Sequence, residues 1–206
     1  MTQKAPPSRS APQKSSRSVA TTHRLLAAAE ASFGARGYHA TRVDDIVERA
    51  GTSHGTFYRY FPSKDAAFTA LLEQIADEFA GLAERLPALA PGPASRQELI
   101  EWLTSFIELY RTHWPLLRSW IETEQRDDPA GELATDLINT LAGAMAGRVT
   151  GRRARQPDRQ LGSVILVGLI DRLAYYCESG QADAEDAAVT STLADAIMSA
   201  WFPVRV

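Results

Sequence analysis

The sequence contains only one cysteine and no long apolar run. A single thiol, Cys177, cannot form a disulfide within the 206 residues, which is typical of a protein in a reducing cytosol. We expect this thiol to be buried and inert rather than reactive. No stretch of about 18 apolar residues is present, and the first residues lack the apolar segment of a secretory signal. The expected location is therefore cytoplasmic, without a membrane partner.

The patterns that most enzymes need are also absent. We find no glycine-rich phosphate loop, no metal-ligand spacing and no Ser/His/Asp order. The four histidines are scattered along the chain, and the adjacent carboxylates Asp44 and Asp45 would point about 100° apart on a helix. We therefore predict a protein that is not an enzyme, with no cofactor and no metal site.

Charge is divided unevenly along the chain. Residues 1–65 carry ten Lys and Arg against five Asp and Glu, whereas residues 66–206 carry twelve against twenty. A basic N-terminal third on an acidic remainder is typical of a protein that meets a polyanion at one end. The formal net charge of -3 conceals this division.

Residues 41–61 have the pattern of two short helices joined by a turn. Apolar residues recur at Val43, Ile46, Val47 and Ala50, which is one face of a helix with Thr41 as its expected N-cap. Gly51 is suited to the left-handed conformation that ends a helix, and Thr52 or Ser53 can cap the next one. The second helix exposes hydrogen-bonding and aromatic side chains with almost no acid, which suits phosphate and base edges. This arrangement predicts a helix-turn-helix whose second helix enters the major groove of DNA.

The same stretch resembles the N-terminal signature of the tetracycline-repressor (TetR) family of bacterial transcription regulators. The matching positions are Val43, Ile46, Ala50, Gly51, Ser53, Gly55, Thr56, Tyr58, Tyr60, Phe61, Ser63 and Lys64. The resemblance implies phosphate contacts by Thr41, Tyr58, Tyr60 and Lys64. It places Thr52, Ser53, His54, Thr56 and Arg59 nearer the bases, and we add Arg42 and Gly55 to the expected DNA-binding set.

The expected fold is all-α, with an N-terminal three-helix DNA-binding domain joined by a long helix to a C-terminal helical domain. We divide the chain into a disordered basic arm (1–17), a DNA-binding domain (18–65) and an effector-binding and dimerisation domain (66–206). The arm is either a solvated tail or an extra DNA contact. Helices are expected from Ser18 to Arg36, from Ser63 and from Ser95, with a loop over residues 86–95 and a break at residues 113–115.

Large rings gather in the C-terminal domain beside a segment of small residues. They either fill the core or line an apolar cavity with a few polar anchors for an unknown small-molecule effector. The residues predicted to line this pocket are Trp102, Phe106, Tyr110, His113, Leu117, Trp120, Ile121, Glu124 and Leu141.

The last two helices carry more apolar surface than one small protein readily buries. A two-fold interface between copies would cover it as a four-helix bundle, and the family resemblance implies the same arrangement. The residues predicted at this interface are Val164, Val167, Leu169, Ile170, Leu173, Val189, Leu193, Ile197 and Trp201.

These features together predict a homodimeric, ligand-released repressor that binds a palindromic double-stranded DNA operator. The half-sites should lie about 34–36 Å apart, or a multiple of that distance. The alternatives are an activator of the same family and a helical adaptor that does not bind DNA.

Overall fold

The computed structural model describes residues 16–121, 129–150 and 158–202, and within these ranges the chain forms α-helices and one isolated β-bridge. The all-α prediction is confirmed. The helices are α1 (Ser16–Arg36), α2 (Val43–Arg49), α3 (His54–Tyr60), α4 (Lys64–Glu84), α5 (Pro93–Ile121), α6 (Pro129–Arg148), α7 (Arg159–Glu178) and α8 (Asp186–Trp201). Apart from Ser16 and Arg17, the predicted N-terminal arm lies outside the described residues.

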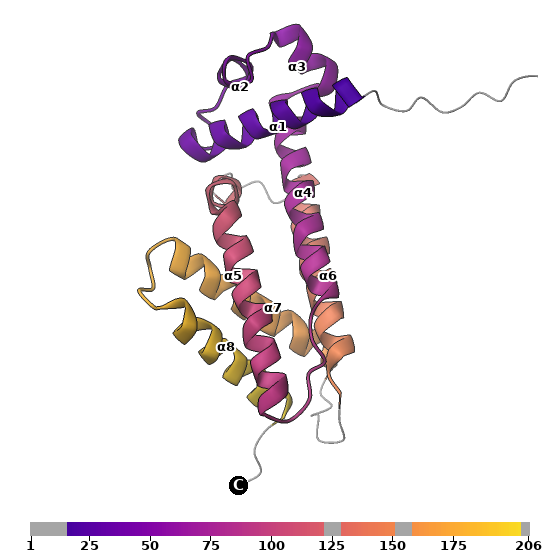
Figure 1. The fold of residues 1–206 in the computed structure, drawn as a ribbon, viewed down its shortest axis with the longest axis vertical. Coiled ribbons are helices and arrows are strands. Elements are labelled where there is room, and N and C mark those ends of the chain that lie inside the picture. Colours follow the sequence, from indigo (N-terminus) through magenta and orange to yellow (C-terminus); the bar gives the residue numbers. More distant parts are fainter. Residues whose placement is uncertain (1–15, 122–128, 151–157, 203–206) are drawn as a thin grey trace, which may run out of the picture.

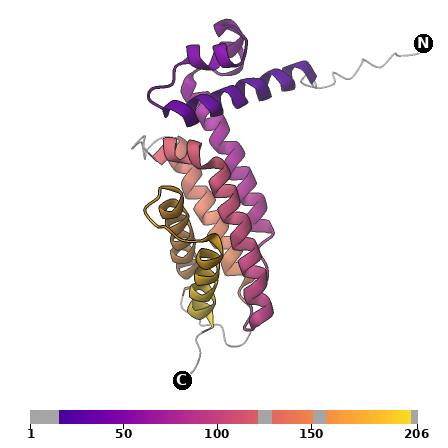
Figure 2. The same cartoon turned by 60° about the vertical axis from the view of Figure 1, so that its left-hand side comes forward.

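The helices form a small unit at one end of the molecule and a larger bundle at the other (Figures 1 and 2). The small unit holds α1, α2 and α3. Helix α4 packs against α1 at its beginning and against α5 and α6 further along, so that it runs from one unit into the other. In the bundle, α6 also packs against α7, and α5 packs against α8. A displacement of α4 in the bundle is thereby transmitted directly to the small unit.

An aromatic core fixes the small unit on the start of α4. Phe33 of α1 is fully buried, and its ring lies 4.9 Å from the ring of Phe68 in α4. Ile46 of α2 and Phe57 of α3 are also fully buried. Burial of side chains of this size stabilises by about 1.5–3 kcal/mol each, which is what holds helices of only seven residues in place.

The structure corrects two predicted boundaries of α5. This helix begins at Pro93, so that the preceding loop is shorter than predicted, and Ser95 lies inside the helix. The predicted break at residues 113–115 is wrong, because the helix continues through Pro115 to Ile121. Proline removes one helical hydrogen bond and bends the helix, and the last turns of α5 do point away from the rest (Figure 1). Burial of Leu116 and Leu117 offsets this loss.

The preceding loop is ordered by hydrogen bonds instead of by regular structure. The Leu89 amide donates to the Arg148 carbonyl at 2.8 Å, and the Thr150 amide donates to the Leu89 carbonyl at 2.8 Å. The hydroxyl of Ser95 donates to the carbonyl of Ala88 at 2.9 Å and accepts from the amide of Ala90 at 3.0 Å. These contacts tie the start of α5 to the end of α6.

Gly162 in α7 allows the indole of Trp201 in α8 to pack against the backbone. A Cβ atom at this position would lie 2.9 Å from Cη2 of Trp201, whose side chain is 2% exposed. The contact closes the end of the bundle and depends on the absence of a side chain.

We predict that Gly162→Ala lowers the free energy of unfolding by about 1–2 kcal/mol, because the buried indole must shift to admit a methyl group. Chemical denaturation measures this loss. Gly143→Ala is the matched control, since a Cβ there meets no atom of the described residues within 4 Å, and alanine should stabilise α6 by up to about 1 kcal/mol. Equal stability of wild type and Gly162→Ala would contradict the prediction.

Candidate nucleic-acid interface

The turn between α2 and α3 is set by local hydrogen bonds. The N-cap of α2 is Arg42 and not Thr41 as predicted, and the Arg42 amide donates to the carboxylate of Asp45 at 2.8 Å. Gly51 has φ +59°, the left-handed conformation predicted for it, and the amide of Thr52 donates to the carbonyl of Val47 at 2.9 Å. The predicted cap at Ser53 is confirmed: its hydroxyl accepts from the amide of Thr56 at 3.3 Å.

Helix α3 presents one face to solvent at the end of the molecule (Figure 1). Phe57 is buried in the hydrophobic core, and α3 packs against α2, whereas Tyr58 is 53% exposed. Ser53, His54, Gly55 and Arg59 are also exposed, and Thr52, Thr56 and Tyr60 are half-buried. The structure therefore gathers most of the predicted DNA-binding residues on one exposed helix, with donors and aromatic groups that suit a major groove.

Two polar contacts restrict this face. Nε2 of His54 lies 2.6 Å from Oδ1 of Asp44, which ties the first turn of α3 to α2. A DNA base that forms a hydrogen bond with His54 must therefore compete with the carboxylate of Asp44. The Tyr60 hydroxyl points to the N-terminal turns of α1: hydrogen bonds with Ser18 and, less strongly, with Thr21 lower the pKa of this phenol.

The structure corrects the predicted phosphate contacts of Thr41 and Lys64. Thr41 is 1% exposed, and its hydroxyl donates to the carbonyls of Gly37 at 2.7 Å and Ser32 at 3.1 Å. The ammonium of Lys64 donates to the carbonyls of Tyr38 at 2.8 Å and Thr41 at 3.1 Å and lies 4.3 Å from the centre of the Tyr38 ring. Burial lowers the pKa of this lysine. The Thr41 hydroxyl thus holds the loop after α1 to the end of that helix, and Lys64 ties the same loop to the start of α4.

This junction contains a residue that the sequence did not single out. The Tyr38 hydroxyl donates to the carboxylate of Asp65, the residue next to Lys64. The only signal in the sequence was the lysine in the first turn of a helix, where the helix dipole disfavours a cation. In this structure the ammonium of Lys64 is balanced by two backbone carbonyl oxygens.

The residues predicted to bind an effector lie mainly inside the bundle. Trp102, Phe106 and Tyr110 are at most 6% exposed, and the Trp102 indole N–H donates to the Leu82 carbonyl at 2.9 Å. The ring centres of Trp102 and Phe106 lie 5.8 Å apart, and those of Phe106 and Tyr110 lie 6.3 Å apart. Burial raises the pKa of Tyr110. Leu117 and Leu141 are buried and Trp120 is half-buried. Glu124 lies outside the described residues.

Two cavities are lined by different residues. One of about 190 Å³ is bordered by Ile121, which is exposed, together with Trp114, Arg118, Tyr175, Glu178 and Ser179. The other, of about 270 Å³, lies between α1 and α5 and includes His113 from the predicted set. No group of three or more His, Cys, Asp or Glu side chains within residues 16–121, 129–150 and 158–202 is arranged to hold a metal ion. No helix in these ranges is long and apolar enough to span a membrane.

Six of the nine predicted dimer residues are buried in the core of the single subunit. They are Val167, Ile170, Val189, Leu193, Ile197 and Trp201. Val164 and Leu173 are half-buried, and Leu169 is 43% exposed. The exposed apolar face of α7 is instead formed by Leu161, Ile165, Leu169 and Tyr176, of which Ile165 is the most exposed at 63%. The sequence showed surplus apolar surface but not which side of α7 faces the bundle.

Comparison with known proteins agrees with this architecture. Residues 25–71 match the family model described as bacterial regulatory proteins, tetR family. The regulator YdgC of Bacillus subtilis is 39% identical over 71 residues, which are 34% of this chain and 36% of that protein. The transcriptional activator FasR of Mycolicibacterium smegmatis is 28% identical over 182 residues, 82% of this chain and 78% of that protein.

The similarity extends to the fold of the whole molecule. The FadR regulator of Bacillus subtilis, solved with stearoyl-CoA, superposes with a TM-score of 0.66 at 18% identity and covers 86% of this chain and 98% of that structure. The matching N-terminal region contains the helix-turn-helix and the beginning of α4. Residues 25–71 therefore carry the DNA-binding domain of the tetR family of bacterial regulatory proteins, and the rest of the described chain has the fold of solved TetR-family regulators.

Proposed function

We propose that the protein is a cytoplasmic, homodimeric repressor that binds a palindromic double-stranded operator and is released by a small-molecule effector. The observation that carries this proposal is the exposed face of α3, which offers Thr56, Tyr58 and Arg59 outward from a helix anchored by Phe57. A seven-residue helix contacts only a few base pairs, so two copies at a fixed separation are needed for a specific site. The adjoining residues Arg42, Ser53 and His54 complete the proposed contact surface.

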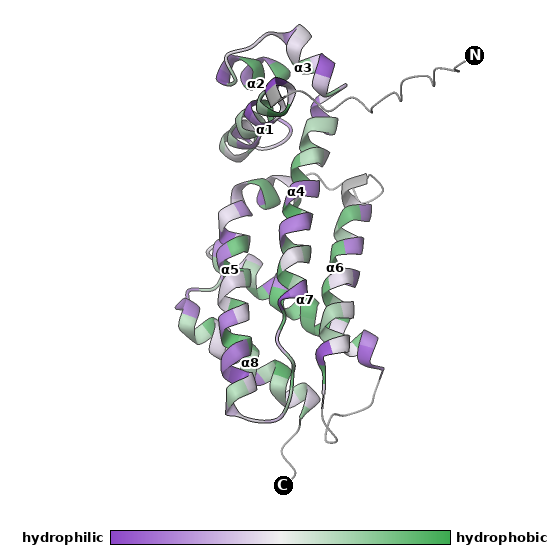
Figure 3. Ribbon diagram, turned by 45° about the vertical axis from the view of Figure 1, so that its right-hand side comes forward, coloured by the Kyte–Doolittle hydropathy of each residue, from purple (hydrophilic) through white to green (hydrophobic). Residues whose placement is uncertain are grey.

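The exposed apolar face of α7 supports the dimer. Leu161, Ile165 and Leu169 follow one another at four-residue steps and therefore form one stripe along the helix. Hydrophobic residues occupy much of α7 (Figure 3). An exposed apolar stripe of this kind can pack against the same stripe of a second subunit, related to the first by a two-fold axis. We propose this face, and not the six buried residues, as the subunit interface.

The effector is proposed to enter the bundle beside the rings of α5. Trp102, Phe106 and Tyr110 would form its apolar wall, with Leu117 and Leu141 beside them. FadR of Bacillus subtilis, which has this fold, was solved with stearoyl-CoA, so the architecture can hold an apolar ligand. Release follows if the effector binds more tightly to the conformation in which α4 holds the two α3 helices at the wrong separation. In this division, residues 18–65 bind DNA and residues 66–206 bind the effector and the second subunit.

We predict that Arg59→Ala weakens operator binding by about tenfold, because it removes an exposed guanidinium of α3 that would contact either a phosphate or a base edge. Operator fragments are first selected from genomic DNA with the purified protein, and fluorescence anisotropy then measures affinity at several salt concentrations. If Arg59 contacts phosphate, the slope of log K against log salt decreases by about one. Arg85→Ala is the matched control, since Arg85 is exposed at the far end of α4.

Equal affinity of wild type and Arg59→Ala for every selected duplex would overturn the DNA-binding proposal for this face. The regulatory direction needs a separate measurement, since FasR, which matches most of the chain, is an activator. A reporter gene behind the selected operator should be less active when the protein is present. Increased reporter activity would show that the protein is an activator and not the proposed repressor.

A further inference from the structure

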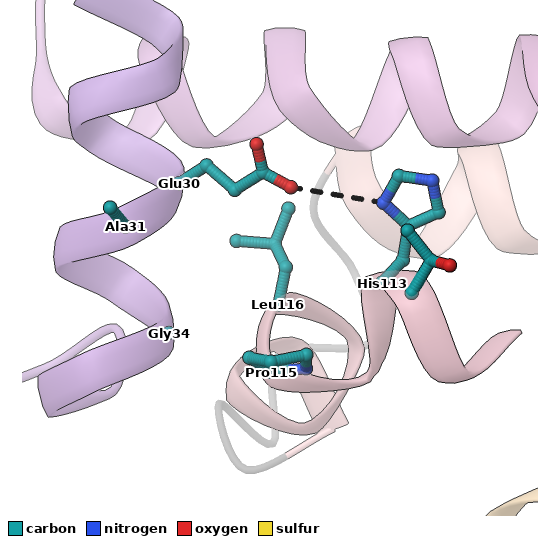
Figure 4. Close-up of a pocket in the computed structure, with 7 residues that line it drawn as sticks. Glu30, Ala31, Gly34, His113, Pro115 and Leu116 are labelled. Atoms are coloured by element: carbon teal, nitrogen blue, oxygen red, sulfur yellow. Dashed lines mark ion pairs between the residues drawn. The ribbon is translucent and has the colours of Figure 1, made fainter. Parts of the chain in front are cut away.

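The cavity between α1 and α5 lies where the DNA-binding unit meets the bundle (Figure 4). Helix α1 contributes Glu30, Ala31 and Gly34, and α5 contributes Thr112, His113, Pro115 and Leu116. Its volume is about 270 Å³, near the lower limit for small-molecule sites. The two helices approach closely at one border, where a Cβ on Gly34 would lie 3.0 Å from Cβ of Pro115. A ligand in this cavity would therefore contact both units.

The imidazole of His113 contacts Glu78 through the ring nitrogen that faces away from Glu30. Its Nε2 lies 3.2 Å from Oε2 of Glu78 in α4, and the imidazole is 9% exposed. An ionised carboxylate can only accept a hydrogen bond, so the proton of a neutral imidazole belongs on Nε2. Nδ1 then presents a lone pair to the cavity, and it has no hydrogen-bond partner among the described residues. A buried acceptor of this kind costs stability until a donor reaches it.

A second acceptor faces the same space. Oε1 of Glu30 lies 3.8 Å from Nδ1 of His113, on the line drawn in Figure 4. This separation is too long for a hydrogen bond between the two groups. It is short enough for one nitrogen to lie at about 2.9 Å from both, since two such bonds meet comfortably across 3.8 Å. A primary ammonium has donors in several directions and a charge that the Glu30 carboxylate would neutralise.

We propose that this cavity binds a small primary amine in its ammonium form. The nitrogen donates to Oε1 of Glu30 and Nδ1 of His113, and the hydrocarbon part lies against Ala31, Pro115 and Leu116. The bound amine joins α1 to α5 and stabilises the relation of the two units seen in this structure. The site is separate from the rings inside the bundle, so the inference goes beyond the proposed function and does not depend on it.

The protonation of His113 gives the first test. In protein labelled with ¹⁵N histidine, two-bond ¹⁵N–¹H spectra at about pH 7.5 should show Nδ1 unprotonated and Nε2 carrying the proton, a distinction that such spectra make directly. Addition of benzylamine should move the Nδ1 resonance. A doubly protonated ring that already joins Glu30 and Glu78 would overturn the proposal, because Nδ1 would then be a donor.

Calorimetric titration with benzylamine gives the second test, with benzyl alcohol as the neutral analogue of the same shape. The amine should bind at least about tenfold more tightly than the alcohol, and Glu30→Gln should weaken amine binding by about tenfold or more. Glu108→Gln is the matched control, because Glu108 is exposed on α5 and does not line the cavity. Equal binding of amine and alcohol, or unchanged binding to Glu30→Gln, would refute the site. Neither result affects DNA binding, which is measured without amine.

Discussion

Replacing Ile165 and Leu169 together by glutamate should convert the proposed dimer into monomers and lower operator affinity by at least about a hundredfold. Both side chains lie on the exposed apolar face of α7, at 63% and 43% exposure. Each contributes about 1.5–3 kcal/mol when buried, and each occurs twice in a two-fold interface. The substitutions also place like charges opposite one another, which cost further free energy without a cation to pair them. A monomer holds only one α3 and loses the second half-site.

Multi-angle light scattering after size exclusion measures the mass, and anisotropy measures the affinity. The double variant should retain its helical circular dichroism, because neither side chain is part of the buried core of the subunit. The matched control is Thr135→Glu with Asn139→Glu, which adds the same charge at the same spacing on exposed positions of α6. That control should remain a dimer. A dimeric Ile165→Glu/Leu169→Glu variant with normal operator affinity would show that α7 is not the interface.

Lys64→Met destabilises the protein by about 2–3 kcal/mol and leaves the salt dependence of DNA binding unchanged. The ammonium donates to the carbonyls of Tyr38 and Thr41, and hydrogen bonds from a charged donor contribute about 1.5–3 kcal/mol each when shielded from water. Partial exposure of Lys64 reduces that sum, and the cation–π contact with Tyr38 adds to it. Methionine keeps the aliphatic stem but leaves both carbonyls without their donor.

Urea denaturation measures the loss, and anisotropy in several salt concentrations measures the slope. Arg59→Ala is the opposite case: it should weaken operator binding and change the free energy of unfolding by less than about 0.5 kcal/mol. If Lys64→Met instead reduces the slope by about one without loss of stability, the lysine contacts phosphate, and the role assigned to it by the structure is wrong.

Local signals in the sequence predicted the helix-turn-helix closely. Gly51 has the left-handed conformation expected of a helix end, and Ser53 and Ser63 cap α3 and α4 through their hydroxyls. These features depend on neighbouring residues only, so a single sequence contains them. The all-α class also follows from periodicity along the chain. The same approach failed at Pro115, because continuation of α5 depends on distant packing partners.

Side-chain partners far apart in sequence could not be predicted in this way. Lys64 meets carbonyl oxygens more than twenty residues earlier, and Glu30, Glu78 and His113 meet from three different helices. Thr41, expected at a phosphate, is buried, and its hydroxyl donates to carbonyls of Ser32 and Gly37. Each of these contacts requires the relative placement of helices that local patterns leave open.

The sequence by itself determined the all-α class, the caps at Ser53 and Ser63 and the donor-bearing segment that forms α3, because these depend on residues within a few turns of one another. Only the tertiary structure decided which side of α7 is exposed, which partner Lys64 has and where a cavity lies between α1 and α5. A helix that is apolar on nearly every side has the same sequence pattern whichever side faces the core. Packing against α6 fixes that choice and leaves Leu161, Ile165 and Leu169 exposed on the other side of α7, the face proposed for a second subunit.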